Sequence, residues 1–172
     1  MKKVINIIWN ISFIFYLLAL VMLLFVGVMF VGARGHVWTD LSLIEYLRRS
    51  SNFVPFKTIS IYIKAMFNGS LNISIPIKNL LGNLIMFLPM GIYLPYYIKK
   101  INKVGRFTFS MIILLFVIEV TQLVTRRGSF DIDDFILNIV GAWIGFIIWK
   151  TKTVQRLLKL DVSYSSAKEG FR

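Results

Sequence analysis

The chain has 172 residues, of which 57% are hydrophobic and 15% aromatic, and its mean hydropathy is +0.73. Only 16% are charged, against about 25% in a typical soluble domain, so the composition excludes an ordinary soluble domain and indicates an integral membrane protein. In a soluble protein, the net charge of +12 would suggest nucleic-acid binding. Here the basic residues cluster beside apolar runs, the juxtamembrane pattern that orients helices and meets anionic lipid. We therefore expect membrane lipids as partners and no nucleic acid.

The chain contains no cysteine and one histidine, His36. The lack of cysteine excludes a disulfide framework, a thiolate nucleophile and a cysteine-ligated metal. His36 lies in a polar loop entry and is interpreted as an interfacial residue. We predict no cofactor from this inventory, and zinc is disfavoured because carboxylates occur without histidine.

The first apolar run, residues 4–33, exceeds the roughly 20 residues that cross a bilayer. It is longer than the core of a secretory signal, so we predict an uncleaved first transmembrane helix. Lys2 and Lys3 precede it and favour a cytoplasmic N-terminus.

An outer connection follows at residues 34–74. Near the beginning of this connection, the sequence predicts a short helix over 41–49. In the segment 58–67, apolar residues lie on one helical face and polar ones opposite, which is typical of a helix in the membrane interface; the apolar set is Ile59, Ile63, Met66 and Phe67. A strand is the alternative, because Ile59, Ile61 and Ile63 also alternate.

Three further spans are predicted at residues 75–98, 107–125 and 131–149, with a tight hairpin over 126–130 and a basic tail over 150–172. Pro89 removes a backbone donor within the second span, so we expect a kink there. The fold class is an all-α integral membrane protein in a single domain. Four spans place both termini in the cytoplasm, with twelve basic residues inside and eight outside.

Four of the eight acidic residues fall in sixteen consecutive positions, flanked on both sides by long apolar runs: Glu119, Asp131, Asp133 and Asp134. Carboxylates within membrane spans are costly and mark functional sites. Glu119, Asn83 and Asn138 each lie roughly 8–10 Å from the outer end of their helix. We therefore expect the polar groups of three helices to share one layer.

Helical spacing places these polar residues on common faces that should turn towards one another. The predicted ligand-binding residues are Asn79, Asn83, Glu119, Gln122, Arg126, Arg127, Asp131, Asp133, Asp134 and Asn138. Asp133 falls off the shared face, so it is expected to cap the hairpin or meet an arginine. Arg126 and Arg127 are the expected counter-ions, and Gly141 and Gly145 should allow close approach of a neighbouring helix. The alternative is that these groups only hold the helices together.

At these positions the chain resembles the VanZ-like family of bacterial membrane proteins, over about residues 50–149. The resemblance rests on five motifs: Asn52-Phe53-Val54-Pro55-Phe56, Asn79-x-x-x-Asn83-x-x-x-Phe87-x-Pro89-x-Gly91, Glu119-x-x-Gln122, Arg127-Gly128-Ser129-Phe130-Asp131-Ile132-Asp133-Asp134, and Asn138-x-x-Gly141. It implies a multi-pass protein of the bacterial cell membrane, in a family associated with resistance to the lipoglycopeptide teicoplanin.

Three functions remain open. In the first, a polar cleft at the outer face binds an envelope lipid, a lipid-linked wall precursor or the antibiotic, since guanidinium groups suit phosphate and carboxylate. In the second, an enzyme acts on a lipid-linked substrate, with Glu119, Asp131 and Asp134 as acid and base or as Mg²⁺ ligands. In the third, the chain is a small transporter or flippase, which would need a homodimer.

Overall fold

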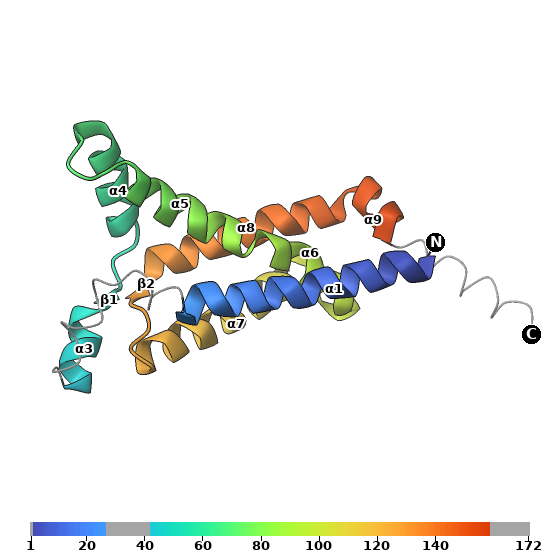
Figure 1. The fold of residues 1–172 in the computed structure, drawn as a ribbon, viewed down its shortest axis with the longest axis horizontal. Helices are drawn as coiled ribbons and strands as arrows, with labels where there is room; N and C mark the ends of the chain where they lie inside the picture. The colour runs from blue at the N-terminus through green and yellow to red at the C-terminus, as the bar shows by residue number, and fades with distance from the viewer. Residues whose placement is uncertain (1, 27–41, 159–172) are drawn as a thin grey trace, which may run out of the picture.

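The computed structural model describes residues 2–26 and 42–158. Within them, four helices are long and apolar enough to cross a membrane, Lys3–Phe25, Ser74–Tyr97, Val104–Val124 and Ile132–Lys150. They run along the long axis of the molecule (Figure 1), which confirms the predicted fold class. Three predicted regions lie outside the described residues: the end of the first span at 27–33, the start of the connection at 34–41 with His36, and the tail from 159.

The first span is helix α1 (Lys2–Val21), which continues as the π-helical turn η1 (Met22–Val26). It packs on the second span through aromatic side chains. The rings of Trp9, Phe13 and Tyr16 lie 4.8, 4.9 and 5.6 Å from that of Tyr93. Such ring pairs add to the packing energy of the buried area alone, so they hold α1 against its neighbour.

The second span is broken, as Pro89 predicts. Helix α5 (Ser74–Met86) ends one residue before α6 (Leu88–Tyr97), and Phe87 between them has φ −99° and ψ 0°. The carbonyl of Met86 accepts a hydrogen bond from the Tyr16 hydroxyl at 3.0 Å. A neighbouring helix thus satisfies a backbone group at the break, which a lipid chain could not do.

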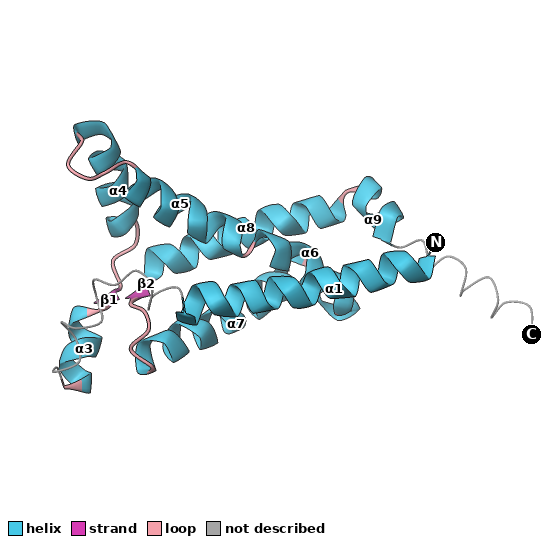
Figure 2. Cartoon of the chain, in the orientation of Figure 1, coloured by secondary structure: helices cyan, strands magenta, loops and turns pink. Residues whose placement is uncertain are grey.

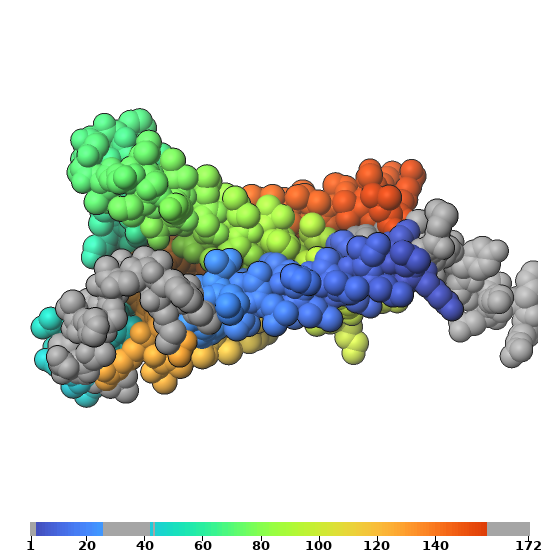
Figure 3. Space-filling view, in the orientation of Figure 1, coloured from blue at the N-terminus to red at the C-terminus, as the bar shows by residue number. Residues whose placement is uncertain are grey.

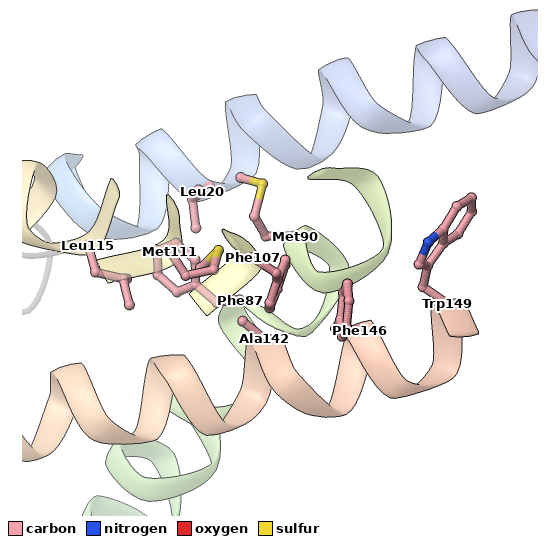
Figure 4. Close-up of a cluster of buried hydrophobic side chains, with 9 residues drawn as sticks. All are labelled: Leu20, Phe87, Met90, Phe107, Met111, Leu115, Ala142, Phe146 and Trp149. Atoms are coloured by element: carbon pink, nitrogen blue, oxygen red, sulfur yellow. The ribbon is translucent and has the colours of Figure 1, made fainter. Parts of the chain in front are cut away.

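The third and fourth spans are α7 (Val104–Val124) and α8 (Ile132–Lys150), flanked by the short helices η2 (Lys99–Ile101) and α9 (Lys152–Leu158). Their inner faces meet α1 and α6 in one hydrophobic core (Figure 4). The members are Leu20, Phe87, Met90, Phe107, Met111, Leu115, Ala142, Phe146 and Trp149. The rings of Phe107 and Phe146 stack at 4.4 Å, which joins the first turn of α7 to the C-terminal part of α8.

Glycines set the distance between the second and fourth spans. A Cβ atom added at Gly141 would lie 1.8 Å from the carbonyl oxygen of Leu84, and one at Gly145 would lie 1.9 Å from that of Leu88. Gly91 faces α8 in return, since its added Cβ would lie 2.1 Å from the Ala142 carbonyl oxygen. This confirms the predicted close approach and identifies α5 and α6 as the neighbour.

The described part of the outer connection is mostly helical (Figure 2). Helix α3 (Leu43–Arg49) begins with a capping box of Ser42 and Glu45, and α4 (Lys57–Asn68) follows. The helix expected over 58–67 is therefore confirmed and the strand alternative is not. The sequence did not predict that β1 (Ser51–Asn52) would pair in parallel with β2 (Phe130–Asp131).

The two ends of the bundle differ. The start of α1 and helix α9 lie at one end, and α3, α4 and both strands lie at the other, which we call the hairpin end (Figure 1). There α4 and the start of α5 project away from α1 (Figure 3). Several apolar side chains of α4 are exposed, with Phe67 at 89%, which fits a helix at the membrane interface.

We expect Gly141→Ala to destabilise the fold by about 1–3 kcal/mol or more, because its Cβ would overlap the Leu84 carbonyl. The control is Gly82→Ala in α5, where an added Cβ meets nothing within 4 Å. It should be neutral or stabilise the helix by up to about 1 kcal/mol. Thermal unfolding of the detergent-purified proteins distinguishes the two; equal midpoints would contradict the proposed helix contact.

Candidate functional site

The polar residues of three spans gather near the hairpin end. Glu119, Gln122, Asp133 and Asn138 are buried, although they lie in helices of high hydropathy. Asn83 donates a hydrogen bond to Asp134, which joins α5 to α8. Glu119 and Gln122 belong to α7, and Asp133, Asp134 and Asn138 belong to α8. We call Asn83, Glu119, Asp134 and Asn138 the polar layer.

Asp133 has no exposed surface and fastens the outer connection to α8. Its two carboxylate oxygens accept backbone N–H groups from Phe56, Thr58 and Ile59, the latter two at 2.7 and 3.1 Å. Phe56 is the N-cap residue of α4, and Thr58 and Ile59 lie in its first turn. The N–H groups of a first helical turn have no partner within the helix and favour negative charge. Asp133 therefore caps the start of α4, which differs from the expectation that it would cap the hairpin or meet an arginine.

This contact also explains an unusual backbone conformation. Phe56 has φ +63°, in the left-handed region that costs a bulky residue free energy. Its N–H donates to Asp133, and a charge-assisted hydrogen bond of this kind offsets such a cost. Asp133 therefore determines how the chain enters α4.

Asp131 makes the second set of bonds to the connection. Its side chain accepts from the backbone N–H of Asp133 at 2.9 Å and so caps α8. It also accepts from the amide of Asn52 at 3.0 Å and from the hydroxyl of Thr58 at 2.6 Å. Asn52 additionally donates to Thr58 at 3.1 Å, so the group forms a closed network beside the paired strands.

The hairpin ties α7 to the end of the first span. Gln122 donates to the carbonyl of Leu24 at 2.8 Å, and Arg127 donates to the carbonyl of Phe25 at 2.9 Å. Arg126 is exposed, has φ +55° and places its guanidinium 5.7 Å from the centre of the Tyr46 ring. The role of the two arginines as counter-ions of the carboxylates stays a prediction.

Not every predicted residue joins this group. The exposed side chain of Asn79 donates to the carbonyl of Ile75 in its own helix at 2.8 Å. Asn79 thus lies apart from the polar layer, although it shares a sequence motif with Asn83. A four-residue spacing places two side chains on one side of a helix. Asn79, however, lies about one turn nearer the start of α5 than Asn83, where its side chain is exposed.

Two residues were missed. Buried Tyr46 donates from its hydroxyl to the carbonyl of Gly128 at 2.6 Å, and Thr58 bonds to Asp131. Both contacts join segments more than 70 positions apart, so no local pattern could indicate them. The available signal for Thr58 was its position at the start of the predicted helix over 58–67, shortly after the motif at 52–56.

Within residues 2–26 and 42–158, no group of three or more acidic or histidine side chains could hold a metal ion. Asp131 and Asp133 are engaged with the connection, while Glu119 is buried in the bundle and Asp134 accepts a hydrogen bond from Asn83. Chemically, the hairpin end combines hydrogen-bond acceptors inside with guanidinium groups at the hairpin. That arrangement suits a ligand with both donor and anionic groups.

Residues 13–155 match the family model described as VanZ/LLP1. The chain belongs to this family. A curated relative, "Protein VanZ" of Enterococcus faecium, is 28% identical over 109 residues, which cover 63% of this chain and 58% of the relative. The match therefore spans less than two thirds of the relative's length. No solved structure matches the chain.

Replacing Asp133 tests the anchor in this VanZ-family protein. In Asp133→Ala, the N–H groups of Phe56, Thr58 and Ile59 lose their acceptor. A hydrogen bond to a charged group contributes about 1.5–3 kcal/mol to the free energy of unfolding. Hydrogen exchange of those amides should accelerate by at least about tenfold. Glu45→Gln, which alters the exposed cap of α3, is the control; unchanged exchange in Asp133→Ala would refute the anchoring role.

Proposed function

We propose that this protein contributes to teicoplanin resistance in the bacterial cell membrane by binding a polar group of an envelope lipid, a lipid-linked wall precursor or the antibiotic. Membership of the VanZ/LLP1 family supports the biological setting. The observation that carries the binding mode is the hairpin, where Arg126 is exposed beside the ring of Tyr46. A guanidinium group recognises phosphate or carboxylate through paired hydrogen bonds.

The hairpin end would face the outside of the cell. Basic residues favour the cytoplasmic side of a membrane, and the topology predicted from the sequence assigns twelve of the twenty to the side of the termini. Envelope precursors and the antibiotic are both met on the outer side. The proposed orientation thus places Arg126 where these ligands arrive.

The outer connection supports a ligand that enters from the lipid. Phe53 before α4, Ile63 in its middle and Phe67 near its far end are exposed. Apolar side chains of this kind insert into the headgroup region. The anchor at Asp133 holds the start of α4 beside the hairpin. A ligand with a lipid tail and an anionic head could contact both surfaces at once.

Arg126 is a sharper test than Arg127, because Arg127 also holds the end of the first span. Loss of a charge-assisted hydrogen bond weakens binding by about tenfold or more. In a teicoplanin-susceptible host, Arg126→Ala should therefore abolish most of the protection and change the amount of antibiotic bound per cell. Arg126→Lys, which keeps the charge without the fork, should retain part of it.

The matched control is Arg106→Ala, which removes an exposed arginine at the opposite end of α7. Membrane levels of the three variants and the native protein are compared by immunoblot. If Arg126→Ala is present at native level and leaves both susceptibility and bound antibiotic unchanged, the proposed binding role of the hairpin is refuted.

A further inference from the structure

Arg126 has a long, flexible side chain, yet its guanidinium lies against an aromatic ring. The side chain is exposed, and its guanidinium carbon lies over the ring of Tyr46, 5.7 Å from the ring centre. A cation within about 6 Å of the centre of an aromatic ring is attracted to the negative face of the ring. This contact gives an exposed arginine a preferred position before any ligand arrives.

Tyr46 is itself fixed to the hairpin. It belongs to α3 and is 4% exposed, whereas the other described side chains of that helix are partly or fully exposed. Its hydroxyl donates to the carbonyl of Gly128 at 2.6 Å. One side chain thus contacts the hairpin at two points, Gly128 through its hydroxyl and Arg126 through its ring.

The backbone of the hairpin fixes where the Arg126 side chain begins. Arg126 has φ +55°, and its N–H donates to the carbonyl of Leu123 at 3.1 Å. The N–H of Arg127 donates to the carbonyl of Gln122 at 2.8 Å. A Cβ atom added at Gly128 would lie 3.2 Å from that of Gln122, so the turn packs closely on the end of α7. A left-handed residue persists only where its surroundings hold it, and here they do.

We propose that Tyr46 is a positioning residue, whose ring holds the Arg126 guanidinium in the orientation in which it binds an anionic group. This role rests on the proposed function of Arg126. A guanidinium donates hydrogen bonds in its own plane, so a ring against its face does not block recognition of phosphate or carboxylate by its edge. Ordering a flexible side chain on binding weakens affinity by about two- to tenfold. An arginine that is already held by a ring avoids this loss.

The first test measures the order of the Arg126 side chain in the absence of ligand. Nitrogen NMR relaxation of its Nε–H group is recorded on the detergent-purified full chain, and Arg126→Lys assigns the signal by its loss. Phenylalanine and pentafluorophenylalanine at position 46 have similar shapes, and both lack the bond to Gly128. Fluorination reverses the charge distribution of the ring, which removes its attraction for a cation. Tyr46→Phe should therefore keep Arg126 ordered, and pentafluorophenylalanine should make its Nε–H group more mobile.

The control for this measurement is Tyr97→Phe, which removes a tyrosine hydroxyl that donates to Asn10 at 2.7 Å. It should leave the order of the Arg126 side chain as in the native protein. Because the two variants at position 46 differ in the electrostatics of the ring, a purely structural role of Tyr46 would affect both alike. Equal order of Arg126 in both variants would overturn the positioning role, whatever Arg126 binds.

The second test separates this role from the proposed function in the teicoplanin-susceptible host. Tyr46→Leu lacks the ring and the hydroxyl, and Tyr46→Phe lacks only the hydroxyl. At equal membrane levels, Tyr46→Leu should lower the tolerated teicoplanin concentration by about two- to tenfold relative to Tyr46→Phe. Equal protection by these two variants, where Arg126→Ala is unprotected, would overturn the positioning role alone. Native protection in Arg126→Ala would instead overturn the proposed function, and with it any role of Tyr46 in binding.

Discussion

The contact between Asp133 and the first turn of α4 is the constraint on which the hairpin end depends. A fully buried carboxylate accepts three backbone N–H groups from a segment about 75 positions earlier in the chain. Without those donors a buried charge would be strongly unfavourable. With them, α4 begins at a defined place, Phe56 keeps its left-handed backbone, and the paired strands close beside the anchor.

This constraint divides the four clustered carboxylates by role. Asp131 and Asp133 hold the outer connection, and their oxygens are occupied by its side chains and backbone. Glu119 is buried instead, as is Asn138, and Asp134 accepts a hydrogen bond from Asn83 of the second span. The four carboxylates are close together in the sequence but have two different roles in the structure. Asp131 and Asp133 anchor the outer connection, and Glu119 and Asp134 belong to the polar layer.

The second span connects the anchor to the hydrophobic core. Its break at Phe87 lets α5 follow α8 towards the hairpin end while α6 packs on α1. Glycines at 91, 141 and 145 bring the backbones of the second and fourth spans together. Because polar side chains can meet only where backbones approach, this packing positions Asn83 to reach Asp134.

The sequence by itself determined the four spans, the break near Pro89, the close approach at Gly141 and the general location of the polar layer. These follow from local properties: run length, proline chemistry and helical period. Tertiary structure alone decided that Asp133 caps α4, that Tyr46 and Thr58 belong to the hairpin end, and that Asn79 does not join the layer. The reason is that hydrogen bonds between distant segments depend on how helices dock, and helical spacing specifies a face but not its partner.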